Sequence, residues 1–519
     1  MTHRIAFIGM GPRGLGAAEA LLALWPEAMI EVFDPGMHPG AGPNFSPDQS
    51  PHCLLNLPLR NLDIARDGTL IDDITGDPER FPARAELGQH LCQRFNALGL
   101  THHHRAVRDI QHDEASGGWM LSTPQGPEGP FAEVLIAPGQ PRSHPDPQFS
   151  KWKAHAQEHA LDLVPAYPDR ALLAVAKGWA GKAVGVRGLA LSSIDVVRLL
   201  TLGMGGRFKA GRYLPSGMEP ARIVPFSLNG LPPAPKPATA TLDAGFDATE
   251  AETARFEAAL AEALDSPAEP PLAMICAALE VPVERITGDR AATRDWLAAE
   301  RENPGSQEDR AAPEVLRGLI AMADGSASAS PGYVAGQVWR KWQDALRKGF
   351  NPRDVAPEIA QAVTGFDDGM KRFSYGPPLT SATELMTLIE DGRVDMRAVD
   401  DPDIVTGPDG WRLCNDEDRV EVAAMVDAVL PSPDLSIVSD PLIARLRDRG
   451  VLVPLAEGLA AKTEPDGQVQ PGLSVLGRMA YGSVIAVDSL HDCFGAAAQR
   501  WAEGVCARQR APSSTMRGG

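Results

Sequence analysis

Three glycines with a characteristic spacing follow the first apolar run of the sequence. Gly9, Gly11 and Gly14 form the pattern Gly-x-Gly-x-x-Gly, and an Ala/Leu-rich stretch comes after them. The first glycine permits a tight turn, the second lets the backbone approach a pyrophosphate, and the third lets a helix pack closely on a strand. Asp34 lies 20 residues beyond Gly14, where an acidic side chain can accept hydrogen bonds from an adenosine ribose. The spacing predicts a dinucleotide-binding turn whose helix N-terminus attracts phosphates.

A second turn of the same kind begins at Gly188. Here alanine, Ala190, stands where the second glycine belongs, and Ser192 follows it. This unit stands where a two-domain flavin enzyme binds NADPH or NADH, but a methyl group at Ala190 would crowd a pyrophosphate. The turn therefore either binds the nicotinamide cofactor loosely or has become structural. Arg207, just beyond the helix, could receive a 2′-phosphate or could belong to a solvated basic turn.

Two further segments favour FAD over NAD for the first turn. The apolar run 133–137 is followed by Pro138-Gly139. Ala137-Pro138-Gly139 resembles the Ala-Thr-Gly end of the strand that closes many FAD domains. Near the C-terminus, a short apolar run leads into Gly477 and Arg478, followed by Gly482 and Asp488. That segment resembles the turn that brings backbone groups onto the flavin ribityl chain and ring, so both ends of the chain are expected to return to one cofactor.

The elements that must position these residues follow from the apolar periodicity. We expect a strand, a helix and a strand at 4–9, 13–25 and 29–34, a helix at 84–98, a β-meander over 105–137, and a strand–turn–helix unit from Lys182. The fold class predicted is α/β: a Rossmann-like flavoprotein with two dinucleotide-binding domains and a mainly helical insertion. The expected division is 1–180 for the FAD domain, 181–237 for the NAD(P)H-binding-like unit, 238–350 for the helical insertion, 351–412 for the remainder of the NAD(P)H or substrate domain, 413–507 for the return to the FAD domain, and 508–519 for a tail.

Composition excludes several functional classes. The chain has 519 residues and a formal net charge of -19, so nucleic acid and anionic membranes are not expected partners. Its six cysteines form no Cys-x-x-Cys pair, which argues against a structural zinc site and against dithiol chemistry. The consecutive histidines 102–104 point to alternate faces of a strand, so no metal is expected there. With no signal sequence and no apolar run of about 18 residues, a cytoplasmic location is predicted.

The motifs together resemble the HpyO/CreE-type FAD-binding family, which includes FAD-dependent urate hydroxylases and nitrosuccinate-forming aspartate N-hydroxylases. The segments that carry the resemblance are Gly11-Pro12-Arg13-Gly14, Asp48-Gln49, Leu54-Leu55-Asn56, Gly188 to Asp195, Tyr213 to Pro220, Gly477-Arg478, Gly482 and Asp488-Ser489-Leu490. The resemblance covers most of the chain except roughly 240–330. It implies FAD and NAD(P)H as cofactors and adds Pro12, Arg13, Gln49, Leu55 and Asn56 to the residues expected to contact them.

The reaction that the resemblance implies is oxygen insertion from O2 into a small-molecule substrate, with N-hydroxylation of an amino acid such as aspartate as the leading hypothesis. Asn56 is expected to line the flavin ring. Arg60 and Arg84 are candidate clamps for a substrate carboxylate, because a guanidinium matches carboxylate geometry, although either could instead face the surface or the FAD phosphates. Two alternatives stay open: an aromatic C-hydroxylase of the urate type, and a flavin-binding pathway protein without NADPH turnover, which Ala190 favours. Assembly into a homo-oligomer is also left open.

Overall fold

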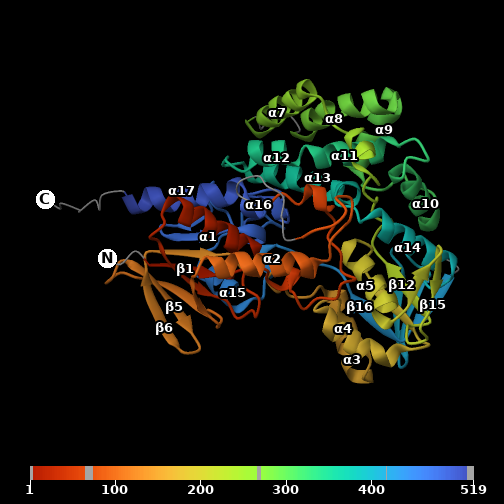
Figure 1. The fold of residues 1–519 in the computed structure, drawn as a ribbon, viewed down its shortest axis with the longest axis horizontal. Coiled ribbons are helices and arrows are strands. Elements are labelled where there is room, and N and C mark those ends of the chain that lie inside the picture. Colours follow the sequence, from red (N-terminus) through yellow and green to blue (C-terminus); the bar gives the residue numbers. More distant parts are fainter. Residues whose placement is uncertain (1–3, 65–73, 266–270, 416–417, 511–519) are drawn as a thin grey trace.

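The computed structural model describes residues 4–64, 74–265, 271–415 and 418–510. Two mainly parallel sheets, each with helices around it, and a separate group of helices make up the chain (Figure 1). This arrangement confirms the predicted α/β fold with two Rossmann-like units and a mainly helical insertion. Within the described ranges, no helix is both long enough and apolar enough to cross a membrane.

The first unit is built on a six-stranded sheet that contains both ends of the chain. Its order is β17 (Gln468–Gln470), β18 (Leu473–Val475), β7 (Glu133–Ile136), β1 (Arg4–Ile8), β2 (Met29–Phe33) and β3 (Thr101–His103). All neighbours are parallel except β17 and β18. The central strand β1 is almost continuously buried, as expected for a parallel strand covered on both faces. Helix α1 (Pro12–Leu24) connects β1 to β2 and thereby confirms the βαβ unit.

Three other helices complete this unit: α2 (Arg84–Ala97), α16 (Leu490–Phe494) and α17 (Ala496–Arg510). Helices α16 and α17 pack beside α1, although they lie at the other end of the sequence (Figure 1). The antiparallel strands β4 (Asp109–Asp113), β5 (Gly118–Thr123) and β6 (Gly126–Phe131) form the meander. The last strand of the expected 105–137 meander, β7, instead pairs with β1, because its continuous apolar run suits a sheet buried on both faces.

The second unit repeats this plan. Its four-stranded parallel sheet has the order β12 (Arg222–Phe226), β9 (Ala183–Arg187), β16 (Ala424–Asp427) and β8 (Asp162–Pro165). Helix α5 (Leu191–Thr201) follows β9, as α1 follows β1. A second meander, β13 (Asp403–Gly407), β14 (Gly410–Asn415) and β15 (Asp418–Val422), precedes β16, which pairs with β9 as β7 pairs with β1. The short hairpin β10 (Arg207–Lys209) and β11 (Arg212–Leu214) lies between α5 and β12.

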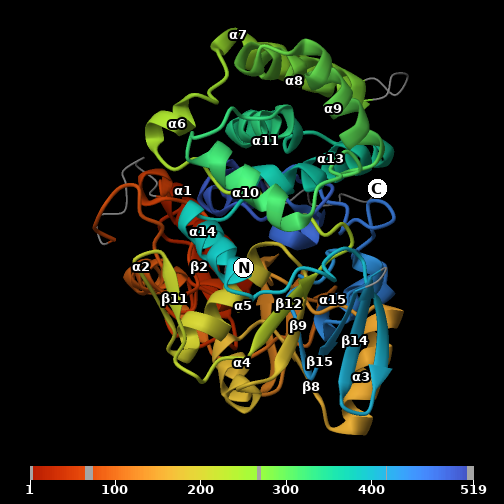
Figure 2. The same cartoon turned by 90° about the vertical axis from the view of Figure 1, so that its right-hand side faces the viewer.

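The helical region is inserted between β12 and β13 of the second unit. Its helices are α6 (Ala240–Ala244), α7 (Glu250–Asp265), α8 (Pro271–Thr287), α9 (Arg290–Glu302), α10 (Ala312–Ala323), α11 (Pro331–Lys341), α12 (Gln343–Phe350), α13 (Pro357–Ser374) and α14 (Leu379–Glu390). Figure 2 shows most of them gathered at one end of the molecule, away from the strands. The helices continue past residue 350, where the helical insertion was expected to end. Strands β14 to β16 still belong to the second unit, so the chain returns to the first unit later than the expected residue 413. The remaining helices are α3 (Pro147–His159), α4 (Asp169–Ala176) and α15 (Pro441–Asp448).

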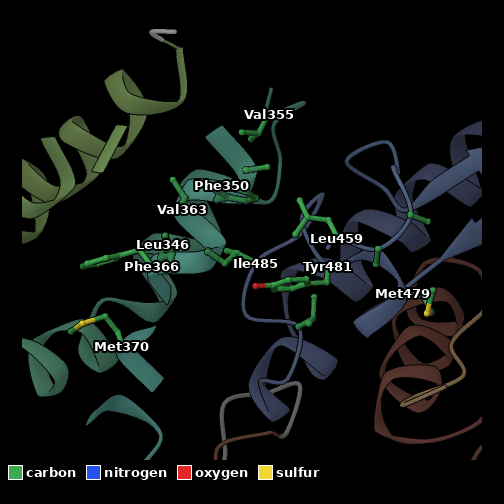
Figure 3. Packing of buried hydrophobic residues seen from close by; sticks show 14 of the residues in the cluster. Leu346, Phe350, Val355, Val363, Phe366, Met370, Leu459, Met479, Tyr481 and Ile485 are labelled. Carbon is green, nitrogen blue, oxygen red and sulfur yellow. The ribbon is translucent and has the colours of Figure 1, made fainter. Parts of the chain in front are cut away.

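The helical region is attached to the first unit by an apolar core. Phe350 and Leu346 of α12 lie close to Ile485 and Tyr481 of the C-terminal segment (Figure 3). Polar contacts support this packing: the Ile485 N–H donates to Asn351 Oδ1 at 2.8 Å, and the Tyr481 hydroxyl donates to the carbonyl of Thr364 at 3.3 Å. The segment that contains Gly477 and Asp488 is therefore held between the first sheet and the inserted helices.

Candidate functional site

The glycines of the first turn serve different purposes. Gly9 has φ +89°, and a Cβ there would lie 2.4 Å from the Ala137 carbonyl oxygen. A Cβ on Gly14 would lie 2.6 Å from the Gly9 oxygen. Gly11 differs, because it has an ordinary extended backbone and its Cβ would meet no protein atom closer than Gly42 Cα at 3.9 Å. Internal packing therefore explains Gly9 and Gly14, but it does not explain Gly11.

The space beside Gly11 faces the start of α1. No side chain caps this helix, and Pro12 occupies its first turn. An uncapped helix N-terminus with an open approach is a place where backbone N–H groups bind phosphate. Gln49 gives a second indication of a bound group, because it is 8% exposed and its Oε1 is buried without a hydrogen-bond partner. Both features fit a dinucleotide such as FAD.

Asp34 supports the turn directly. Its Oδ2 accepts the Met10 N–H at 2.5 Å, and its Oδ1 accepts the Gly36 N–H at 2.6 Å. Asp34, at the end of β2, thus fixes the glycine turn that follows β1. The remaining lone pairs of its carboxylate are the ones that a ribose would use. Gly139, at the end of the neighbouring β7, has φ +70°, and a Cβ added there would have no atom within 4 Å.

The side chain of Arg13 contacts the C-terminal segment. Its guanidinium is buried and donates to Asp492 Oδ2 at 2.6 Å and to the Val487 carbonyl at 3.1 Å. These contacts tie α1 to the segment that leads into α16. Leu55 is also buried in the core of the first unit, and its neighbour Asn56 is half-buried on the same loop.

The C-terminal segment brings Arg478 against Asp488, while Gly477 lies beside Arg13 and Gly482 packs on Leu459. Arg478 Nη1 lies 2.6 Å from Asp488 Oδ1, while Arg478 Nε is buried without a partner among the described residues. Lys371 of α13 contacts the other carboxylate oxygen at 3.2 Å. Burial alone would raise the pKa of Asp488, but Lys371 and Arg478 outweigh it and hold this pKa below its ordinary value. Asp488 is therefore a carboxylate that joins α13 to the Gly477 turn.

Arg84 connects the two units. It forms an ion pair with Asp195 of α5 at 2.5 Å, donates to the Tyr167 hydroxyl at 3.1 Å and donates to the Leu54 carbonyl at 3.3 Å. Burial raises the pKa of Asp195 against the opposing effect of Arg84. These partners lie far apart in sequence, which is why the sequence pattern could not reveal this role. Among the described residues, no contact brings Arg84 and Arg60 to the same carboxylate.

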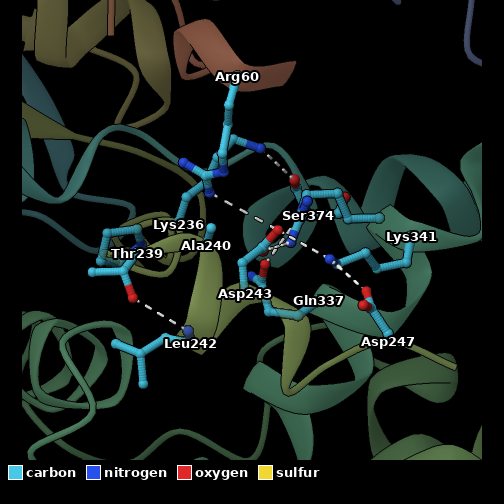
Figure 4. A network of polar contacts seen from close by, with 12 residues as sticks. Arg60, Lys236, Thr239, Ala240, Leu242, Asp243, Asp247, Gln337, Lys341 and Ser374 are labelled. Atoms are coloured by element: carbon cyan, nitrogen blue, oxygen red, sulfur yellow. Dashed lines mark hydrogen bonds and ion pairs between the residues drawn. The ribbon is translucent and has the colours of Figure 1, made fainter. Parts of the chain in front are cut away.

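Arg60 instead belongs to a polar cluster at the edge of the helical region (Figure 4). It lies in the short 3-10 helix Leu59–Asn61 and pairs with Glu79, while its Nη2 lies 4.0 Å from Asp243 Oδ2. Asp243 also pairs with Arg340 and with Lys341. Sequence reasoning missed a further basic residue of this cluster, Lys236, which lies in a Pro-rich stretch without helical or strand periodicity.

The second glycine turn closely matches the first. Ala190 caps α5 with φ -84° and ψ -163°, and Gly11 caps α1 with φ -84° and ψ -167°. Alanine adopts this extended backbone without strain. The hydroxyl of Ser193, at the third glycine position, donates to the Gly188 carbonyl. Arg207 lies in β10, beyond the end of α5 opposite to the Gly188 turn, so the structure does not bring the two together.

One cavity lies outside all the predicted positions. It has a volume of about 860 Å³ and lies beside Arg222 of β12, between the start of α10 and the segment 392–400. Its arginines are paired with acids: Arg222 and Arg397 with Asp395, and Arg310 with Glu308. In the described part of the chain, no group of three or more His, Cys, Asp or Glu side chains could hold a metal ion.

Comparison with known proteins agrees with the geometry of the first turn. Residues 6–141 match a family model described as FAD-NAD(P)-binding. Nitrosuccinic acid synthase npaA of Aspergillus oryzae is 32% identical over 44% of this chain and 41% of its own length. An L-aspartate N-monooxygenase (nitrosuccinate-forming) of Streptomyces davaonensis is 31% identical over 44% of each chain. The chain thus spans less than half the length of these two relatives.

A third relative aligns over nearly the whole chain. The L-aspartate N-monooxygenase (nitrosuccinate-forming) of Streptomyces cremeus is 25% identical over 94% of this chain and 88% of its own. The solved ornithine N-hydroxylase of Kutzneria sp. 744 covers 98% of this chain, with a TM-score of 0.49 and 13% identity. The matches confirm the resemblance to nitrosuccinate-forming aspartate N-hydroxylases that the sequence motifs indicated.

Proposed function

We propose that this chain, whose residues 6–141 match the FAD-NAD(P)-binding family, is a FAD-dependent monooxygenase that uses NAD(P)H to N-hydroxylate a small amino acid, with aspartate as the best candidate. The observation that carries the proposal is the pair of matching turns, one at Gly9–Gly11 and one at Gly188–Ala190, each at an uncapped helix N-terminus. One chain thus offers two dinucleotide sites, as a reaction between NAD(P)H and a flavin requires. The activities for which the three relatives are named support the choice of aspartate.

The residues that would hold FAD come from both ends of the chain. The N–H groups at the start of α1, exposed to approach beside Gly11, would bind the pyrophosphate. Asp34 would accept the ribose hydroxyls, and Gln49 Oε1 would find a donor in the bound group. Bound FAD supplies the redox chemistry and oxygen activation that amino-acid side chains lack.

The second turn would hold NAD(P)H at the start of α5. Gly188 has φ +111° and corresponds to Gly9, and the half-buried Ser192 lies in the first turn of the helix. The methyl group of Ala190 would stand between the backbone and the pyrophosphate. We therefore expect a lower affinity for NAD(P)H than glycine would give at this position, with NAD(P)H oxidation retained.

The substrate amine and carboxylate need different environments. An amine attacks oxygen only as the neutral base, so surrounding cations help because they disfavour the ammonium form. The protein carries a net charge of -19, so an anionic substrate needs local positive charge. Arg60 supplies this charge at the helical region, and since Glu79 takes its Nη1, a bidentate carboxylate would approach the Nε and Nη2 side.

The test is a substrate panel on the purified, FAD-loaded protein. Oxygen-dependent NADPH and NADH oxidation is measured with aspartate, asparagine, ornithine and urate, and mass spectrometry is used to look for added oxygen. Aspartate should stimulate the oxidation most and gain oxygen on its nitrogen. Efficient oxygenation of urate instead would establish an aromatic C-hydroxylase, and flavin binding without NAD(P)H oxidation by any substrate would establish a non-catalytic flavin protein.

A further inference from the structure

Lys236 is a buried lysine without an acidic partner among the described residues. It lies between β12 and α6, is 7% exposed, and donates through Nζ to the Ser374 carbonyl at 3.3 Å. Within the described ranges, no carboxylate forms an ion pair with it. Its neighbours differ in this respect, because Arg340 and Lys341 both pair with Asp243.

This environment is unfavourable for an ammonium group. Removing a charge from water costs free energy unless a counter-charge or several hydrogen bonds replace the solvent. Burial, reinforced by the positive charges of Arg340 and Arg60 and only partly opposed by Asp243, holds the pKa of Lys236 well below its ordinary value. A bound anion would supply the missing counter-charge and would favour the protonated amine.

The position of Lys236 links it to the proposed active site. Its acceptor, Ser374, lies one helical turn from Lys371 on α13, and Lys371 contacts Asp488 beside the Gly477 turn. The loop that carries Arg60 is tied to the same region, since His491 Nε2 lies 2.9 Å from the Asn61 carbonyl oxygen. Figure 4 shows Lys236 between Arg60 and Ser374. Lys236 therefore contacts α13 beside Arg60, and both α13 and the Arg60 loop contact the C-terminal segment.

We infer that Lys236 binds the second carboxylate of a dicarboxylic substrate whose first carboxylate binds Arg60, and thereby distinguishes this substrate from monocarboxylic analogues. The identification of the substrate as an amino acid rests on the proposed function. The pairing of two carboxylates with Lys236 and Arg60 does not rest on the proposed function, because it is inferred from the arrangement of charges in the cluster.

The experiment uses succinate, which has two carboxylates and no amine, and butanoate, which has one carboxylate on a chain of the same length. Each is titrated by calorimetry into the FAD-loaded wild-type protein and into Lys236→Met, Lys236→Arg and Lys341→Met. Lys341→Met removes a positive charge from the same Asp243 cluster without touching Ser374, and is the matched control. Flavin content and thermal unfolding establish that each variant is folded.

The wild type should bind succinate more tightly than butanoate. Lys236→Met should weaken succinate binding about 10- to 100-fold, as expected for loss of a charge-assisted contact, and should leave butanoate binding unchanged. Lys236→Arg should restore part of the preference, and Lys341→Met should keep it. Equal binding of the two acids by the wild type, or an unchanged preference in Lys236→Met, would overturn the inference.

The outcomes separate this inference from the proposed function, because succinate binding requires no turnover. Succinate binding that depends on Lys236, in a protein that does not oxygenate aspartate, would leave the inference standing and refute the function. Oxygenation of aspartate by wild type and Lys236→Met with equal kcat/KM, and without any succinate preference, would leave the function standing and refute the inference.

Discussion

Replacing Gly11 by alanine should weaken FAD binding and leave the fold intact. The added methyl group would meet no protein atom closer than 3.9 Å, and Gly11 already has a backbone that alanine adopts readily. Losing glycine freedom in the unfolded chain stabilises the protein by about 0.4–1 kcal/mol. Alanine is a poorer helix N-cap than glycine by a similar amount, so the net change in unfolding free energy should stay within about 1 kcal/mol.

The effect on the cofactor should be much larger. The methyl group fills the space through which a pyrophosphate would reach the N–H groups of α1. Losing one charge-assisted hydrogen bond costs about 1.5–3 kcal/mol, which weakens FAD binding by about 10- to 100-fold. Gly11→Val, with a branched side chain, should give protein without flavin colour.

The assay compares the flavin-to-protein absorbance ratio, the FAD affinity of the apoprotein and the midpoint of thermal unfolding. Gly178→Ala is the neutral control, because no atom lies within 4 Å of the added methyl group. Gly14→Ala is the opposite control, since its Cβ would lie 2.6 Å from the Gly9 oxygen and should destabilise the fold by about 1–3 kcal/mol. A folded Gly11→Val protein with full flavin content would refute this placement of the pyrophosphate.

Four further changes test other parts of the structure. Ala190→Gly should lower the KM for NADPH in steady-state assays, because the methyl group beside the expected pyrophosphate is removed; an unchanged KM would indicate a structural turn. Arg60→Lys should lower kcat/KM for aspartate by tens- to hundreds-fold, roughly 2–4 kcal/mol, with FAD retained, because an ammonium cannot form the bidentate contact; an undiminished kcat/KM would remove Arg60 from the substrate site. Arg84→Met should lower the unfolding free energy by about 3–5 kcal/mol in denaturant titrations, since Asp195 would remain buried and unpaired; a change below about 1 kcal/mol would contradict a stabilising role for the Arg84–Asp195 ion pair. The pKa of Lys236 is lower in the folded protein than its ordinary 10.5, so the unfolded chain binds more protons and stability should rise with pH up to about that value; Lys236→Met should lose this rise, and an unchanged pH profile would contradict the assignment.

The predictable part of the fold is the part encoded by neighbouring residues. The βαβ unit follows from glycine spacing and apolar runs within the first 34 residues, and the Gly188 turn follows in the same way. Arg13 shows where such reasoning stops, because its partner Asp492 lies 479 positions away in the sequence. Lys236 gave no signal at all, since its Pro-rich segment is buried by helices that fold over it from elsewhere in the chain.

The contrast between the net charge and the local charge explains why Lys236, rather than Arg60, should decide which substrate binds. Exposed charges beyond about 8 Å are largely screened at physiological ionic strength, so nearby charges, more than the net charge of -19, set the affinity for an anion once it is inside the protein. Buried charges are screened far less. In the cluster, Glu79 already offsets part of the charge of Arg60, and Asp243 offsets part of the charge of Arg340, so each of these arginines attracts a substrate carboxylate less strongly. At Lys236 an incoming carboxylate displaces no described acidic partner, and the whole of its attraction is available to distinguish a second carboxylate from a neutral group.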